Sequence, residues 1–251
     1  MSEKNRNSPA PFTGDVRFDS AGDPIGGYLA VAAGDAPAPG LVLIPDVRGI
    51  YEHFRDVARR FAECGFTTLA LDLYAREGAP DLPDLEAAMR WMAALPDERV
   101  LGDIAAAVDF LADHDSVRGR HVGITGFCMG GQYTLMAACS VPRLSAAVSW
   151  YGMLRYADTP AHKPQSPLDM APRLGCPWLG LFGENDPLIP NDDVAELRSL
   201  LQSAGRDFEI VQYPDAGHAF FNDSRPEMYR PEAARDAWPR AIGYLKERLA
   251  G

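Results

Sequence analysis

The 251-residue sequence has little that would place it in a membrane or on nucleic acid. No hydrophobic run approaches the roughly 20 residues that a membrane-spanning helix requires. Basic residues are in the minority, with 24 lysines and arginines against 35 aspartates and glutamates, and the net charge is −11. A basic stripe of the kind that binds nucleic acid is therefore missing. We predict neither a membrane span nor a nucleic-acid partner.

Cysteine is also scarce. Cys64, Cys128, Cys139 and Cys176 are scattered and have no C-x-x-C spacing. That spacing would indicate a zinc or redox site, and a denser set would indicate a disulfide framework. We therefore expect reduced thiols, no metal and no cofactor. Reduced thiols are typical of a cytoplasmic protein, and the polar residues 1–11 lack the apolar segment of a secretory signal.

Hydrophobic residues make up 47% of the chain, enough for a large core. Residues 1–12 are predicted to be a flexible lead, and residues 13–251 have the size of one α/β domain. Short apolar runs alternate with amphipathic stretches, which predicts a mostly parallel sheet of about eight strands with helices on both faces. The expected strands are 15–20, 25–32, 41–45, 66–71, 121–125, 146–150, 178–182 and 208–213, and the expected helices are 54–64, 103–112, 132–139, 193–204 and 233–249.

The segment Gly126-Phe127-Cys128-Met129-Gly130-Gly131 joins an expected strand to an expected helix. A nucleophile between glycines at such a turn is exposed above the sheet, as in the G-x-Nu-x-G elbow of hydrolases. The glycines allow strand and helix to approach closely. The amino terminus of the helix favours a thiolate, the reactive form of cysteine. A small buried core residue is the alternative interpretation of Cys128.

A nucleophilic cysteine needs a base and a residue that orients the base. Asp186 and His218 each follow an expected strand, so that nucleophile, acid and histidine occur in the hydrolase order. The other four histidines fit no such position. We expect His218 to take the thiol proton and Asp186 to hold the imidazole tautomer. Glu184 is an alternative orienting residue, and Asp186 is alternatively a turn residue.

An oxyanion intermediate needs two N–H donors. Met129 directly follows the candidate nucleophile, and Val47 lies in the loop after the expected strand 41–45. Gly49 in this loop permits a tight backbone approach. We therefore predict an oxyanion hole from the N–H groups of Val47 and Met129. A surface turn is the alternative interpretation of this loop.

The chain after its lead resembles the dienelactone hydrolase (carboxymethylenebutenolidase) family of α/β-hydrolases. The resemblance rests on five segments: G-F-C-M-G-G at 126–131, R-D-V-A-R-R-F-A at 55–62, D-L-Y at 72–74, W-Y-G at 150–152 and G-H-A-F at 217–220. It implies a triad of Cys128, His218 and Asp186 that opens a lactone or ester through an acyl-enzyme.

The same resemblance implies further residues of the pocket. Asp46 stands where the family has a glutamate that interacts with the resting thiol. Arg76 matches an arginine that helps to hold a substrate carboxylate, whereas Asn222 replaces a second arginine. The missing charge would then come from Arg48 or from Arg225 a little later in the chain. Tyr151 would line the pocket.

The sequence thus predicts a cysteine-dependent hydrolase of a small ester or lactone, with a carboxylate on the substrate as an option. It would be a monomer or a homodimer. One alternative is a non-catalytic α/β-hydrolase-fold protein that binds a small molecule. Another is a redox thiol protein, for which Cys128 has no evident resolving cysteine. Residues 78–96 are predicted to form either a lid over the pocket or a surface helix.

Overall fold

The computed structural model describes residues 12–34 and 36–250, so the predicted lead lies outside the described part except for its last residue. Eight strands form one sheet in the order β1-β2-β4-β3-β5-β6-β7-β8. Strands β1 and β2 pair antiparallel with their neighbours, and the other pairs are parallel. This confirms the mostly parallel sheet. The strands are β1 (Thr13–Ser20), β2 (Asp23–Ala30), β3 (Ala38–Ile44), β4 (Thr67–Leu71), β5 (Val117–Phe127), β6 (Leu144–Trp150), β7 (Trp178–Gly183) and β8 (Phe208–Tyr213).

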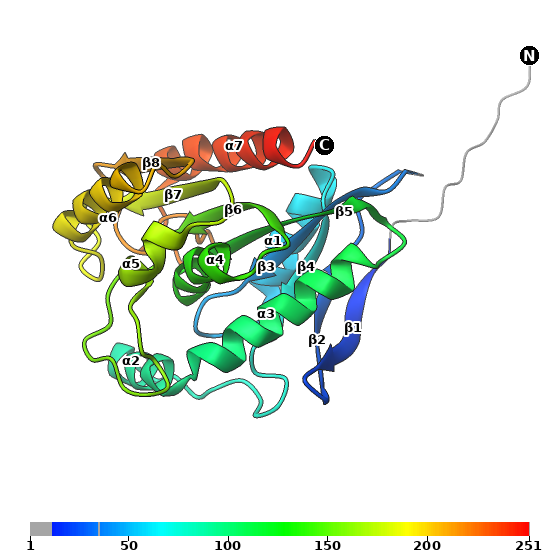
Figure 1. Ribbon diagram of the computed structural model, residues 1–251, viewed down its shortest axis with the longest axis horizontal. Coiled ribbons are helices and arrows are strands. Elements are labelled where there is room, and N and C mark those ends of the chain that lie inside the picture. Colours follow the sequence, from blue (N-terminus) through cyan, green and yellow to red (C-terminus); the bar gives the residue numbers. More distant parts are fainter. Residues whose placement is uncertain (1–11, 35, 251) are drawn as a thin grey trace, which may run out of the picture.

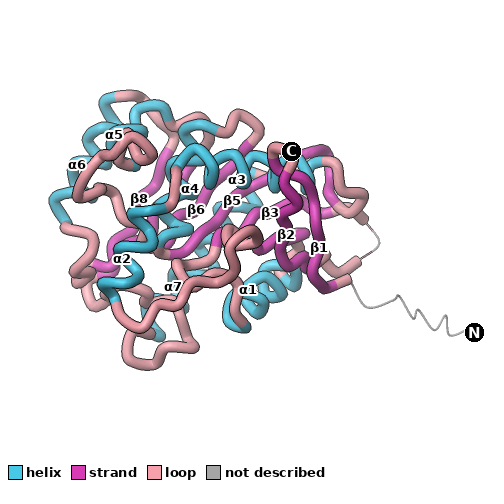
Figure 2. The backbone as a smooth tube through the Cα atoms, turned by 90° about the horizontal axis from the view of Figure 1, so that it is seen from below, coloured by secondary structure: helices cyan, strands magenta, loops and turns pink. Residues whose placement is uncertain are grey.

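Helices cover both faces of the sheet, as predicted. Helices α1 and α7 pack on one face, and α3, α4 and α6 lie on the other, which Figure 2 shows as two layers. None of the helices in residues 12–34 and 36–250 is long and apolar enough to cross a membrane. The helices are α1 (Glu52–Glu63), α2 (Leu85–Ala94), α3 (Asp97–Ala112), α4 (Met129–Ser140), α5 (Pro167–Met170), the 3-10 turn η1 (Ala171–Arg173), α6 (Asn191–Ser203) and α7 (Pro231–Arg248).

The segment 78–96 contains a short helix, α2, which lies apart from the sheet below α4 and α5 in Figure 1. Its first turn is capped by the Asp84 side chain, which accepts a hydrogen bond from the N–H of Ala87. Helix α3 begins at Asp97, six residues before the predicted start. The acidic Asp97 and Glu98 in its first turn favour this start, because negative charge is stabilised at the amino terminus of a helix.

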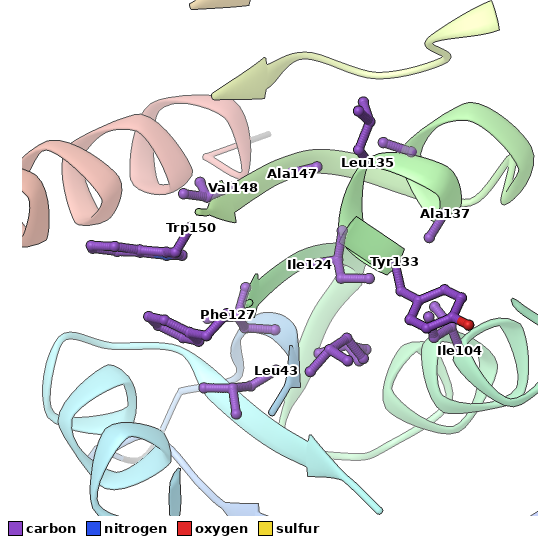
Figure 3. Close-up of a cluster of buried hydrophobic side chains, with 14 of the residues drawn as sticks. Leu43, Ile104, Ile124, Phe127, Tyr133, Leu135, Ala137, Ala147, Val148 and Trp150 are labelled. Carbon is purple, nitrogen blue, oxygen red and sulfur yellow. The ribbon is translucent and has the colours of Figure 1, made fainter. Parts of the chain in front are cut away.

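The central strands carry a core of aromatic and branched side chains (Figure 3). Phe127, the last residue of β5, stacks on Trp150 of β6 with ring centroids 5.1 Å apart. Leu43, Ile124 and Val148 of three neighbouring strands are fully buried in the same cluster. The end of β5, and therefore the position of Cys128, is held by this core.

The strand order reverses direction next to β3. After β3 the chain moves to β4 on one side, whereas β5 lies on the other side of β3. Loops leaving the carboxyl ends of strands diverge at such a point and leave a crevice. The loop after β3 and the turn after β5 therefore meet there. A Cβ at Gly130 would lie only 2.1 Å from the Ile44 carbonyl oxygen, so α4 approaches the end of β3 closely.

Candidate active site

Cys128 sits at a strained turn between β5 and α4. Its backbone has φ 56° and ψ −117°, a conformation that residues other than glycine rarely adopt. The N–H of Cys128 donates to Trp150 O at 3.0 Å, and its carbonyl accepts from the N–H of Gln132. A Cβ at Gly126 would lie 2.2 Å from Gly130 O, so the turn requires glycine there. The predicted strand–turn–helix geometry is present.

His218 and Asp186 are hydrogen-bonded to each other. Nδ1 of His218 lies 2.8 Å from Oδ2 of Asp186, whose side chain is completely buried. The other carboxylate oxygen of Asp186 accepts from the N–H of Leu188 at 2.9 Å. Nε2 of His218 is buried and has no hydrogen-bond partner within the described residues. Asp186 thus orients the imidazole through Nδ1.

The charge on His218 depends on its neighbours. Burial lowers the pKa of His218, but the negative charge of Cys128 and the hydrogen bond with Asp186 outweigh burial and raise the pKa to about 10. The ring of Tyr151 packs edge-on against the imidazole with centroids 5.3 Å apart. Cys128 and Asp186 therefore both favour the protonated form of the His218 imidazole.

Cys128 and His218 open into one cavity of about 420 Å³. Its polar wall comes from the loop after β3 and from the segment after His218, and its apolar wall comes largely from α2 and the loop before it. Leu85 and Met89 of α2 line the cavity and are also partly open to solvent. The lining residues include Asp46, Val47, Arg48, Leu82, Leu85, Ala88, Met89, Met92, Cys128, Tyr151, Met153, Leu188, His218, Asn222, Arg225 and Met228.

The two N–H groups predicted to hold an oxyanion belong to Met129 and Val47. The N–H of Met129 stands at the start of α4, and Val47 lines the cavity. Within the part of the chain that the structure describes, neither N–H donates to an acceptor. The loop that carries Val47 is closed by a 3.0 Å hydrogen bond from the N–H of Gly49 to Asp46 O. Both groups are thus available to a ligand oxygen.

Asp46 is buried at the cavity wall and accepts two hydrogen bonds. Oδ1 accepts from the N–H of Arg48 at 2.9 Å, and Oδ2 accepts from the Tyr51 hydroxyl at 3.2 Å. Burial raises the pKa of Asp46 in spite of these bonds. The Tyr51 hydroxyl accepts in turn from Nδ2 of Asn222. Sequence reasoning missed Tyr51, and no local pattern marks it.

Arg76 lies away from the cavity, contrary to what the resemblance implies. Its guanidinium forms a two-pronged ion pair with Asp103, with N–O distances of 2.7 and 2.9 Å, and also contacts Asp23 at 2.8 Å. The Asp103 side chain is only 3% exposed, so it needs a cationic partner. The structure therefore does not bring Arg76 to Cys128.

Two other arginines line the cavity. Arg225 contacts Glu227 at 3.3 Å. The guanidinium of Arg48 has neither an ion pair nor a hydrogen bond to any described residue, although its backbone N–H binds Asp46. Arg48 is therefore the cation with the most freedom to meet an anionic ligand. No three histidine, cysteine, aspartate or glutamate side chains of the described residues are grouped to hold a metal ion.

The sheet order, with the elbow after β5 and the acid and histidine after β7 and β8, defines an α/β-hydrolase fold. Residues 25–249 match the model of the dienelactone hydrolase family, and the chain belongs to that family. This membership makes the protein a hydrolase of the dienelactone type.

Individual relatives agree with this assignment. Over 246 residues the chain is 39% identical to the "Putative carboxymethylenebutenolidase" of Escherichia coli (strain K12). The matched region covers 95% of this chain and 88% of that protein. It is 37% identical over 224 residues to the "Probable 2-oxo-3-(5-oxofuran-2-ylidene)propanoate lactonase" of Bradyrhizobium sp. That match covers 89% of this chain and 90% of the relative. The crystal structure of a "Putative Dienelactone Hydrolase from Klebsiella pneumoniae subsp. pneumoniae MGH 78578" superposes on this chain with a TM-score of 0.88 at 36% identity. The superposition covers 94% of this chain and 99% of that one.

Proposed function

We propose that this protein opens a small lactone or carboxylic ester through a thioester on Cys128. One observation carries the proposal: the strained Cys128 shares a cavity with His218, whose Nδ1 is held by Asp186 while its Nε2 has no partner among the described residues. A nucleophile, an oriented base and two N–H donors are the parts that acyl transfer requires.

The reaction would start from a thiolate beside an imidazolium. Sγ of Cys128 forms a bond to the carbonyl carbon, and the resulting oxyanion accepts hydrogen bonds from the N–H groups of Val47 and Met129. When the tetrahedral intermediate collapses, the C–O bond breaks and the leaving oxygen takes the proton from Nε2 of His218. Neutral His218 then takes a proton from water, whose oxygen attacks the thioester. The C–S bond breaks and the acid is released, which restores the thiolate and the imidazolium.

A thiol nucleophile favours lactones over simple esters. The alcohol that leaves can attack the thioester and reverse the first step, so hydrolysis must compete with the back reaction. An enol-lactone avoids this reversal because the opened enol tautomerises to a ketone. The Bradyrhizobium relative carries the name of a lactonase for a furanylidene substrate. We therefore propose an enol-lactone for this cavity.

Arg48 would bind a carboxylate on this substrate. It lines the cavity, and its guanidinium forms no direct ion pair or hydrogen bond with the residues that the structure describes. Charge-assisted hydrogen bonds from arginine to a carboxylate are strong and directional. Arg48→Ala should raise KM for an anionic lactone and leave KM for a neutral ester unchanged. Equal changes for both substrates would contradict this role. The matched variant Arg225→Ala tests the second cation of the cavity in the same assay.

The deciding experiment measures acid release from a dienelactone and from p-nitrophenyl acetate, with Cys128→Ala as the blank. Cysteine-dependent opening of the lactone well above the ester is the expected result. Turnover of the ester alone would keep the thioester mechanism and reject the lactone preference. Binding of either compound without turnover would instead support a ligand-binding protein. The cytoplasmic location and the state of monomer or homodimer stay predictions.

A further inference from the structure

Tyr74 contacts both residues of the proposed oxyanion hole. Its hydroxyl lies 2.8 Å from the carbonyl oxygen of Val47 and 3.6 Å from Sδ of Met129. A hydroxyl has one proton, so the shorter contact is the hydrogen bond that it donates, and the sulfur packs beside it. Tyr74 is 1% exposed and is not among the residues that line the cavity. Its route to this site is therefore through Val47 and Met129.

The hydrogen bond fixes one particular peptide group. The loop after β3 is a four-residue turn from Asp46 to Gly49, with Val47 and Arg48 at its centre. The central peptide of such a turn is the one that flips between the common turn types. Here its carbonyl, from Val47, accepts from Tyr74, while its N–H, from Arg48, donates to Asp46 Oδ1. Both ends of this peptide are held. The N–H of Val47 belongs to the preceding peptide, whose carbonyl, from Asp46, accepts from the N–H of Gly49 at 3.0 Å. Because the peptides on both sides of Val47 are held, its backbone keeps one conformation.

The loop is also packed directly on the Tyr74 ring. Gly49 has φ +76°, and a Cβ there would lie 2.9 Å from Cδ2 of Tyr74. The backbone N–H of Tyr74 is anchored by the Asp72 side chain at 2.9 Å. Burial raises the pKa of Tyr74, so its phenol stays neutral and able to donate.

We infer that Tyr74 is a positioning residue that aims the Val47 N–H at the oxyanion of the reaction. The inference rests on the proposed function. It implies that loss of the Tyr74 hydroxyl slows the attack on a carbonyl, in which an oxyanion forms. It should not slow alkylation of the Cys128 thiol, which forms no oxyanion.

The test compares these two reactions in the same full-length variant. Tyr74→Phe keeps the ring and removes only the hydroxyl. Single-turnover release of p-nitrophenol from p-nitrophenyl acetate reports acylation, and the loss of free Cys128 in iodoacetamide reports alkylation, both checked by the mass of the Cys128 peptide. Removing a whole oxyanion donor costs about 10²–10³ in rate, so removing the support of one should cost about tenfold in acylation. Alkylation should stay within about twofold of the wild-type rate.

Tyr28→Phe is the matched control, because Tyr28 is buried, its hydroxyl accepts a bond from Arg59, and it lies outside the cavity lining. Both of its rates should be unchanged. Equal acylation by Tyr74→Phe and the wild type would overturn the inference, as would a parallel fall of both rates. If Tyr74→Phe does not fold, Gly49→Ala, which presses on the same ring, is judged by the same ratio. Absence of Cys128 acylation in the wild type would overturn the proposed function itself and the inference with it.

Discussion

The side-chain amide of Asn222 donates a 2.9 Å hydrogen bond to the hydroxyl of Tyr51 across 171 residues of sequence. The Tyr51 hydroxyl then donates to Asp46 at 3.2 Å. Burial raises the pKa of Tyr51 to about 12, so this link between Asn222 and Asp46 stays neutral at physiological pH. The position where the family resemblance implies an arginine therefore supplies a neutral donor here, and Asp46 has no direct ion pair among the described residues.

Asp46→Asn should change how stability depends on pH. Burial raises the pKa of Asp46 in the folded state, so the folded protein favours the neutral carboxyl. The stability that this adds is complete below the pKa of the unfolded state, about 4, and is lost as pH rises through the pKa of the folded state. Asparagine cannot ionise. We therefore expect the melting temperature of Asp46→Asn to rise relative to that of the wild type as pH increases from 4 to 8. Thermal denaturation at several pH values measures the difference, with Asp81→Asn at an exposed position as the control. Parallel curves would contradict the prediction.

The titration of His218 should depend on Cys128. Against the effect of burial, the charge on Cys128 and the bond with Asp186 raise the pKa of His218 to about 10. The stability that the charged imidazole adds is complete below the pKa of the unfolded state, about 6.5. It is lost as pH rises through the pKa of the folded state, about 10. Cys128→Ser removes the thiol whose charge raises the pKa of His218, so the pKa of His218 should fall. NMR of isotope-labelled histidine rings measures the change, and the other four histidines serve as internal references. An unchanged His218 titration would refute the coupling.

Arg76→Ala should destabilise the fold without altering substrate preference. It leaves Asp103 buried without its ion pair, and because Arg76 is itself 21% exposed we expect a loss of about 2 kcal/mol. Arg90→Ala on α2 breaks an exposed pair with Glu86 and should cost less than about 0.5 kcal/mol. Denaturant unfolding gives both values. A selective rise in KM for anionic substrates in Arg76→Ala would restore the role that the resemblance implies.

Two glycine substitutions in helices should have opposite signs. In Gly130→Ala the new Cβ would lie 2.1 Å from Ile44 O, a backbone atom that cannot move aside, and we expect a loss of about 3 kcal/mol or more. Gly102 lies in α3, and a Cβ there meets nothing within 4 Å. Gly102→Ala should stabilise the protein by about 0.5–1 kcal/mol, because alanine loses less entropy in a helix. Urea denaturation of both variants tests the pair. A tolerated Gly130→Ala would contradict the close approach of α4 to β3.

Local patterns predicted most of the sheet because a buried parallel strand is a short apolar run between turn residues. The runs 178–182 and 208–213 agree closely with β7 and β8. The segment 78–96 permits two interpretations, because a helix that buries only two side chains, as α2 does, can cover a pocket or lie on the surface. It lines the same cavity as Cys128 and His218, which are distant from it in sequence.

The sequence by itself determined the parallel sheet, the elbow around Cys128 and the chain order of Asp186 and His218, because these depend on neighbouring residues and on strand ends. Only the tertiary structure decided the partner of each polar group. Arg76 binds Asp103, Tyr51 binds Asp46, and Tyr74 binds Val47. A buried donor or charge binds whichever partner the packing of strands and helices brings within about 3 Å, and no local pattern encodes that distance.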